Sequence, residues 1–300
     1  MKNLKSLPIP VFLAGGQQAS KTPILKLSIA KIGAIAILFT TQLLFAQEDT
    51  PKRIISLGPS ITKALYLLRV QDKLIANTIY CVEPPEAKKK EKAGTAQKVS
   101  IEKVFRLEPD LVLATSLIDQ RSTEKLRNLG LRVVTFSTPR NFNDICKQFL
   151  ELSRLVGKEK EAKEIVARAE NEAALIREKV KNLHKPKVLI QVGTRPLVVA
   201  TGSYFINDYI EYAAGINIAR DAKEGIYSRE QVLKANPDVI IITTMGIAAE
   251  EEKKIWQKYA VLNAAKFNQI YIIDTDKITS PTPLTFVKAL EEFADILHPE

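Results

Sequence analysis

The feature of this sequence that most constrains its fold is an alternation of short apolar runs with amphipathic segments. Segments of helical periodicity include 61–68, 124–130 and 206–214. Between such segments lie six runs with the length and aliphatic content of buried strands, at 53–57, 111–115, 132–136, 187–192, 239–243 and 270–274. Strands that alternate with helices fold as α/β units around parallel sheets, so we expect a fold of this class.

One segment interrupts the alternation. Residues 158–183 contain neither Gly nor Pro, place apolar residues at helical spacing and fill the other positions with good helix formers. Pro186 follows shortly after and marks the end of the pattern. We expect one helix of about 25 residues, roughly 38 Å long at about 1.5 Å per residue. The predicted fold is therefore two Rossmann-like lobes with parallel sheets, joined by one long α-helix.

These patterns divide the chain into four predicted parts. They are a signal peptide at 1–46, an N-terminal α/β lobe at 47–157, a linker helix at 158–185 and a C-terminal α/β lobe at 186–300. A chain of 300 residues accommodates two such lobes, because domains commonly run to about 100–150 residues.

The first 46 residues have the pattern of an export signal. Lys26 and Lys31 precede an uncharged apolar run that closes on Ala46, the small residue expected before a signal-peptidase cut. The run is about 15 residues long, shorter than the roughly 20 that span a bilayer. No Cys directly follows the run, so lipid attachment at a new N-terminal Cys is not indicated. We expect a protein that is free in the periplasm.

The net charge does not indicate a nucleic-acid partner. The formal charge is +10, but five lysines and no acidic residue fall in the first 46 positions. The remaining lysines and arginines do not form a basic block interleaved with aromatic residues, and the lysines of 86–92 are diluted by glutamates. We therefore expect residues 86–92 to be a solvated loop, and no nucleic-acid binding.

The chain contains an internal repeat. The segment SIEKVFRLEPDLVLAT at 100–115 aligns without a gap with SREQVLKANPDVIIIT at 228–243. In both copies we expect a short helix, a Pro-Asp turn and a buried strand. Ser100 and Ser228 are expected to cap the helices, with Glu102 and Glu230 in the first turn. Such turns are routine in α/β proteins, so the repeat by itself does not establish a function.

The two cysteines leave two possibilities open. Cys81 and Cys146 are able to pair in an oxidising compartment, or they remain as separate thiols. Cys146 lies in a helical pattern, where burial in the core is the commoner fate.

Two lobes, one long helix and an export signal together resemble the helical-backbone (class III) periplasmic substrate-binding proteins of ABC importers, the Fe/B12 periplasmic-binding family. The resemblance is carried by 53–68, 78–89, the two repeat copies and 289–300, and covers nearly all of the predicted mature chain. It implies a monomeric binding protein without catalytic residues, resident cofactor or metal. Its partners would be a metal chelate, captured between the lobes, and a dimeric permease in the inner membrane.

The resemblance also assigns roles to single residues. In that family one glutamate on each lobe contacts arginines of the permease, and the matching positions are Glu102 and Glu230. The pattern departs at Lys63, where the family commonly has an acid. It departs again at 280–283, where an Arg-Pro-Gly-Pro-Arg-like turn is common, so no ligand contact is implied for that loop.

Candidate ligand contacts lie on loops at the expected strand ends, where α/β sheets form crevices. They are Pro59, Ser60, Tyr80, Cys81, Arg195, Ser203, Tyr204, Phe205 and Tyr227. His184 and His298 lie away from these loops, which argues against a bare metal held by imidazoles.

The best interpretation of the ligand is a cobalamin-type corrinoid. A corrinoid carries its own metal, so the protein needs aromatic and apolar surface and a few hydrogen bonds. The segment 191–219 resembles cobalamin-binding members of the family. A ferric siderophore, favoured by basic groups such as Arg195, and haem, held by Tyr80, are the alternatives.

An exported two-domain enzyme is a remote alternative. The sequence lacks a Gly-Xaa-Ser-Xaa-Gly elbow, a glycine-rich phosphate loop and a zinc-binding His pair. The arrangement of one long helix between two lobes also predicts that ligand binding produces only small lobe movements.

Overall fold

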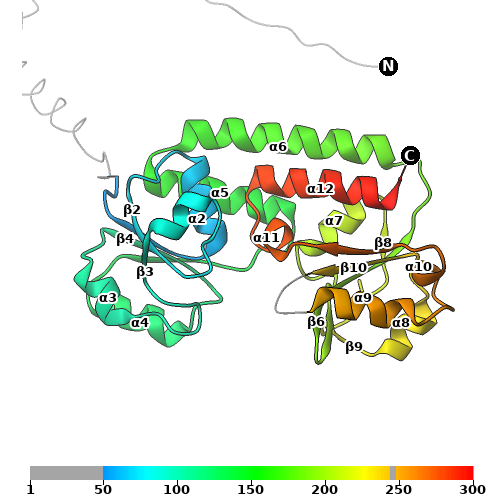
Figure 1. The fold of residues 1–300 in the computed structure, drawn as a ribbon. Helices are drawn as coiled ribbons and strands as arrows, with labels where there is room; N and C mark the ends of the chain where they lie inside the picture. The colour runs from blue at the N-terminus through cyan, green and yellow to red at the C-terminus, as the bar shows by residue number, and fades with distance from the viewer. Residues whose placement is uncertain (1–49, 244–247, 300) are drawn as a thin grey trace, which may run out of the picture. The chain divides into compact units, whose positions relative to one another are not determined.

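The structure is a computed structural model that describes residues 50–243 and 248–299. The predicted signal peptide, 1–46, lies outside the described residues. Asp49–Glu300 forms one compact unit. Figure 1 shows two β-sheets in this unit, each flanked by helices, and this arrangement confirms the predicted α/β fold with two lobes.

The N-terminal lobe is built on a parallel sheet with the strand order β3-β2-β1-β4-β5. The strands are β1 (Ile54–Leu57), β2 (Leu74–Asn77), β3 (Glu91–Lys92), β4 (Leu111–Thr115) and β5 (Val133–Phe136). The connecting segments include the helices α2 (Pro59–Leu67), α3 (Ile101–Arg106) and α4 (Gln120–Asn128) and the 3-10 turn η1 (Pro85–Lys89). All four residues of β1 are buried, as expected for a central parallel strand covered on both faces.

The sheet of the C-terminal lobe is mixed, so the prediction of parallel sheets is wrong for part of it. Strands β6 (Lys187–Thr194), β10 (Val239–Thr243) and β11 (Ile270–Ile273) are parallel. β7 (Leu197–Val199) runs antiparallel to β6 and to β9 (Ile226–Tyr227). The physical reason is the length of the connection, because the two residues between β6 and β7 can join only antiparallel strands.

The remaining elements of this lobe are short. They are α7 (Ile206–Tyr212), β8 (Ile216–Asn217), α8 (Arg229–Ala235), α9 (Ala249–Gln257), α10 (Asn263–Lys266) and α11 (Thr275–Ile278).

Three longer helices lie where the lobes meet. They are α5 (Phe142–Val156), α6 (Glu159–Val180) and α12 (Pro283–Leu297). α6 falls within the segment predicted as the linker helix and packs along both α5 and α12 (Figure 1). Its buried face consists largely of small residues, including Ala162, Ala169 and Ala173, which allow close approach of the neighbouring helices. The lobes are therefore joined by packed helices as well as by the α6 segment itself.

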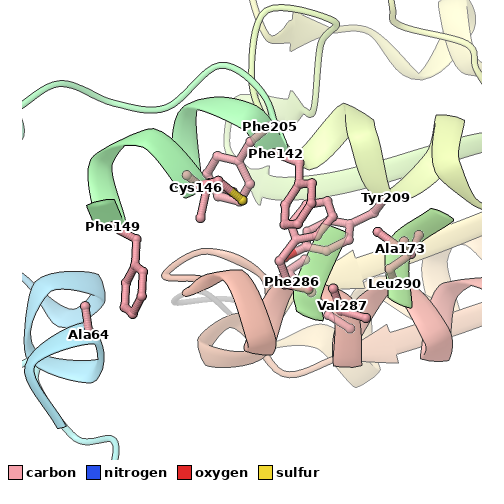
Figure 2. Close-up of a cluster of buried hydrophobic side chains, with 14 of the residues drawn as sticks. Ala64, Phe142, Cys146, Phe149, Ala173, Phe205, Tyr209, Phe286, Val287 and Leu290 are labelled. Atoms are coloured by element: carbon pink, nitrogen blue, oxygen red, sulfur yellow. The ribbon is translucent and has the colours of Figure 1, made fainter. Parts of the chain in front are cut away.

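Stacked aromatic rings from α5, α7 and α12 form a column in the core (Figure 2). Phe286 of α12 stacks between Phe142 of α5 and Tyr209 of α7, with centroid distances of 4.4 Å on both sides. Phe293 extends this aromatic column at 5.0 Å from Tyr209. The carboxylate of Asp208, on α7, accepts the main-chain N–H of Phe142 at 2.7 Å. One continuous core thus connects the first lobe with the second.

The internal repeat has a structural role in both lobes. The carboxylate of Asp110 accepts the main-chain N–H groups of Lys52 and Arg53, at 2.7 and 2.8 Å, immediately before β1. Asp238, the matching residue, accepts the N–H of Lys187 at the start of β6, at 2.8 Å. Each repeat copy therefore anchors the first strand of its lobe to the strand that the copy itself supplies, β4 or β10.

The predicted helix caps differ between the two copies. Ser228 caps α8 through a reciprocal pair of hydrogen bonds with Gln231. Ser100 occupies the same position before α3, but its side chain makes no capping hydrogen bond, so that part of the prediction is wrong. The main-chain N–H of Ser100 instead donates to the Ala93 carbonyl at 2.9 Å, and Lys103, three positions on, pairs with Glu91, so the reciprocal capping pair does not form.

Candidate ligand-binding site

A cavity of about 130 Å³ lies between the lobes at the carboxyl ends of β1, β4 and β5. On the N-terminal side its wall comes from Pro59 and Ser60 after β1, from 137–139 after β5 and from one face of α5. On the C-terminal side it comes from Phe205, from 279–282 between α11 and α12, and from Pro283 at the start of α12. Strand ends of an α/β sheet are the expected place for a small-molecule site.

The cavity is uncharged. Among the described residues that line it, none carries an acidic or basic side chain. The polar groups are the amide of Gln148 and the hydroxyls of Ser60, Thr115, Ser137, Thr138, Thr279, Ser280 and Thr282. The apolar part includes Phe149, which Figure 2 shows extending from α5 toward Ala64 of α2. Such a wall suits a ligand with apolar faces and neutral hydrogen-bonding groups.

Three of the predicted ligand contacts meet in this cavity: Pro59, Ser60 and Phe205. Pro59 and Ser60 start α2 directly after β1, and the turn between the elements is tight. A Cβ atom on Gly58 would lie 2.6 Å from the side chain of Thr115, so glycine allows this turn to approach the end of β4. The sequence pattern β1-Gly-Pro-Ser therefore places the amino end of a helix against the cavity.

Two predicted contacts face the protein interior instead. Cys81 is fully buried, and its sulfur lies 3.2 Å from the hydroxyl of Thr62 and 3.3 Å from that of Thr78. The hydroxyl of Tyr227 donates to the carbonyl of Ile218 at 3.2 Å, and its ring packs against the core of the C-terminal lobe. Neither residue lines the cavity, because tertiary packing uses both side chains to hold adjacent loops.

The other four predicted contacts are exposed and lie outside the cavity wall. They are Tyr80, Arg195, Ser203 and Tyr204. The rings of Tyr80 and Tyr204 are each 49% exposed. A ligand that extends beyond the cavity is needed for any of the four to contact it.

Sequence reasoning missed much of the cavity wall. The segment 137–139 follows a predicted strand, so the rule that selected Pro59 would also have selected it. The α5 residues Ile145, Gln148 and Phe149 gave no signal, since only the tertiary fold turns that helix face toward α2. Residues 280–283 line the cavity although their sequence departs from the turn common in the family.

A second, larger groove of about 1100 Å³ lies on the other side of α2, between this helix and α12. In contrast to the cavity, it is strongly charged. Its described lining includes six carboxylates and three ammonium groups, from Lys63, Glu83, Asp274, Asp276, Lys277, Lys288, Glu291, Glu292 and Asp295. The ammonium of Lys63 donates to the main-chain carbonyl of Asp276 at 2.7 Å. Burial lowers the pKa of Lys63, and the charges of Asp276 and Glu83 oppose that effect.

The predicted docking glutamates are both exposed on short helices, Glu102 on α3 and Glu230 on α8. Hydrogen bonds from a main-chain N–H and from the Ser228 hydroxyl lower the pKa of the Glu230 carboxyl. The neighbouring Arg229 pairs with the buried Glu252 of α9, and its guanidinium lies 4.5 Å from the ring centroid of Trp256. These contacts fix α8 to the lobe that carries it.

Cys81 and Cys146 are both free thiols, so the structure has the separate buried thiols rather than the pair. Burial raises the pKa of Cys146 to about 12. Within the described residues, no group of three or more His, Cys, Asp or Glu side chains is arranged to hold a metal ion. The described helices also include none with the length and apolar character of a membrane span.

Comparison with known proteins assigns the chain to a family. Residues 54–277 match the family described as periplasmic binding protein. An ABC transporter substrate-binding lipoprotein of Bacillus subtilis is 32% identical over 263 residues, covering 84% of this chain and 82% of the relative.

Solved structures agree with this result. The periplasmic vitamin B12 binding protein of Vibrio cholerae superimposes with a TM-score of 0.72 at 26% identity, covering 83% of this chain and 97% of the other. A possible iron-binding (periplasmic solute-binding) protein of Staphylococcus epidermidis superimposes with a TM-score of 0.74 at 27% identity, covering 83% and 100%. The chain therefore belongs to the periplasmic binding protein family, as its sequence resemblance implied, and is a substrate-binding protein rather than an enzyme.

Proposed function

We propose that this chain is the substrate-binding component of an ABC importer and that it captures a corrinoid between its two lobes. The observation that carries the proposal is the cavity, whose described wall has no charged side chain and combines apolar side chains with seven hydroxyls and one amide. A corrinoid contains its own metal and carries neutral amide side chains, and the hydroxyls and the amide of this wall can form hydrogen bonds with those amides. The similarity to a vitamin B12 binding protein at 26% identity supports the same ligand class.

Anionic iron chelates and haem are the competing ligands. A carboxylate that entered this cavity would lose its hydration without gaining a cationic partner from the described wall. Arg195 is exposed and lies outside the wall, as does Tyr80, the residue suspected for haem. The similarity to a possible iron-binding protein makes these chelates the proper comparison in a binding test.

The cavity receives only part of the ligand in this proposal. Its volume of about 130 Å³ is below the roughly 300–1000 Å³ of typical small-molecule sites. The remainder of the ligand would extend toward solvent, where exposed apolar side chains are available. Leu117, in the cavity wall, is 72% exposed, and the rings of Tyr80 and Tyr204 are half exposed.

A charge placed in the cavity wall tests the ligand class. Ser137 is exposed after β5 and lines the cavity, so Ser137→Lys adds an ammonium there without disturbing the core. The proposal predicts at least about tenfold weaker binding of cyanocobalamin, because the new charge is partly desolvated by a neutral ligand. Phe267→Ala, which truncates an exposed ring outside the wall, is the control and should bind normally. Tighter binding of an anionic ferric siderophore or haem to Ser137→Lys, with no cyanocobalamin binding to the unmodified protein, would refute the proposal.

We propose that Glu102 and Glu230 dock the loaded protein on a permease of two similar subunits, one glutamate to each. Both side chains are exposed, and carboxylates form bidentate bonds with arginines. Glu102→Ala with Glu230→Ala should lower ligand uptake by cells at least about tenfold while leaving the Kd of the isolated protein unchanged. Glu164→Ala, an exposed glutamate on α6, is the matched control. Normal uptake by the double variant would exclude the docking role.

We propose that the protein works outside the cytoplasmic membrane, released by cleavage after Ala46. The Bacillus subtilis relative is named a lipoprotein, whereas no Cys directly follows the apolar run of this chain. Mass spectrometry of the exported protein tests this point. An N-terminus at Gln47 without a lipid is expected, and a retained or lipid-modified N-terminus would contradict it.

Small lobe movements are part of the proposed mechanism. The aromatic column joins α5 of the first lobe to α7 and α12, so a wide hinge rotation would separate stacked rings. We expect small-angle scattering to give nearly the same radius of gyration with and without ligand. A large compaction on binding would contradict this mechanism.

A further inference from the structure

The segment 274–283 links the charged groove with the uncharged cavity. Asp274 and Asp276 line the groove, while Thr279 and the following residues line the cavity. Between them lies α11, a helix of only four residues. The main-chain N–H of Lys277 donates to the Asp274 carbonyl at 3.1 Å and that of Thr279 to the Thr275 carbonyl at 2.9 Å. So short a helix depends on outside contacts for its position.

Such a contact comes from the opposite lobe. Lys63 of α2 donates from its ammonium to the carbonyl of Asp276 at 2.7 Å, across 213 positions of sequence. The carboxylates of Asp276 and Asp274 on the C-terminal side, and of Glu83 on the N-terminal side, all attract this ammonium. Lys277, the next cation along α11, already binds Glu292 of α12. Lys63 is thus the ammonium through which α2 holds α11.

The position of Lys63 on α2 gives this contact a consequence for ligand binding. Ile61 and Ala64 face the cavity, whereas Lys63 and Tyr66 face the groove. The bond from Lys63 to α11 therefore lies at the boundary between the two spaces, three residues before Thr279.

We propose that Lys63 is a positioning residue of the ligand cleft, which ties α11 to α2 and thereby holds residues 279–283 in place as one wall of the cavity. The effect of Lys63 on affinity rests on the proposed function, but the hydrogen bond from Lys63 to the Asp276 carbonyl is independent of which ligand binds. Without the ammonium, Glu83, Asp274 and Asp276 would repel one another across the lobes.

Lys63→Met tests the tie directly, because methionine retains an apolar stem and lacks the ammonium. Hydrogen exchange of the Asp276, Lys277 and Thr279 amides in the ligand-free full-length protein should become about tenfold faster, since these amides report the opening of α11. Lys63→Arg retains a charged donor, so the exchange rates of the same amides should lie within about threefold of those in the unmodified protein. Unchanged exchange in Lys63→Met would overturn the proposal.

Lys92→Met is the matched control. Lys92 is also partly buried, and its ammonium binds Asn77 and the Ala87 carbonyl within the N-terminal lobe. This variant removes a lysine tie of the same kind without touching α11, so exchange at 276–279 should stay unchanged. Accelerated exchange there in Lys92→Met would show a general loss of stability and overturn the assignment to Lys63.

Binding supplies the second readout. For Lys63→Met we expect about tenfold weaker cyanocobalamin binding, mainly through faster dissociation, with recovery in Lys63→Arg. Faster exchange with unchanged affinity would overturn the positioning role. If the unmodified protein does not bind cyanocobalamin, the proposed function fails, and the same comparison with the chelate that does bind still decides the role of Lys63.

Discussion

Truncation of Phe286 should destabilise the whole two-lobed unit. This residue is fully buried and stacks on Phe142 and Tyr209 at 4.4 Å on each side, with Tyr212 against its edge. Phe→Ala changes in cores cost about 3–5 kcal/mol. Aromatic pairs add about 0.5–1.5 kcal/mol beyond area burial, which favours the middle to upper part of this range. We expect Phe286→Ala to lower the free energy of unfolding by about 4 kcal/mol.

The assay is urea unfolding followed by two probes. For a unit of this size we take a slope of about 3 kcal/mol per M, so the midpoint should fall by about 1.3 M. Far-ultraviolet circular dichroism reports both lobes. Fluorescence of Trp256, the single tryptophan, reports the C-terminal lobe, where its ring is fully buried and its N–H donates to Gln191 at 2.6 Å. The two probes should give the same midpoint in the unmodified protein, because the lobes share a core.

The control is Phe267→Ala, whose ring is 61% exposed. Its urea midpoint should shift by no more than a loss of about 0.5 kcal/mol in the free energy of unfolding produces. A midpoint shift below about 0.4 M for Phe286→Ala would refute the reasoning that the aromatic column holds the lobes together. Separate transitions for the two probes in the unmodified protein would refute it as well.

Other predictions follow from buried polar groups. Burial raises the pKa of Asp208, so the folded state holds this proton more tightly than the unfolded chain, and stability should fall as pH rises from about 4 through the raised pKa. Asp208→Asn should lose this decline in urea unfolding between pH 4 and 7, and identical pH slopes would contradict the assignment. In the absence of reductant, Cys81 and Cys146 should react with a thiol reagent only after the protein is unfolded. If the unfolded protein then shows no reactive thiol, the two cysteines form a disulfide and the prediction is wrong. Glu252→Gln leaves Arg229 without its buried carboxylate and should lower the free energy of unfolding by about 2 kcal/mol. This is less than for a fully buried pair, because Arg229 is partly exposed. A loss below about 0.5 kcal/mol in the same urea assay would contradict this prediction.

The longer elements could be predicted from the sequence because local pattern determines them. All six predicted strands are present, and the linker pattern forms α6. In the described part of the chain, five further strands that the pattern did not predict are two to four residues long, and they depend on pairing with neighbours rather than on their own composition. They are β2, β3, β7, β8 and β9. The sequence pattern does not predict the antiparallel β6–β7 pair, because the three residues of β7 are too few to show the alternation of a strand.

The site was predictable in part. The end of β1 predicts Pro59 and Ser60, because strand ends form crevices in α/β sheets, and the loop ahead of α7 predicts Phe205. Cys81 and Tyr227 lie on equally plausible loops but turn inward, and only their hydrogen-bond partners reveal this. The second half of the wall comes from α5 and from residues 279–283, which reach the cavity through the packing of α5, α6 and α12.

The most direct test of the account is an equilibrium titration of the purified protein with cyanocobalamin, followed by gel filtration and the visible absorbance of the corrinoid. Haem and a ferric siderophore are titrated in parallel. Absorbance is preferable to tryptophan fluorescence, because Trp256 is buried in the C-terminal lobe core and does not line the cavity. The account predicts one-to-one co-elution of the corrinoid with the protein. Retention of haem or the siderophore, with cyanocobalamin in the free fractions, would contradict it.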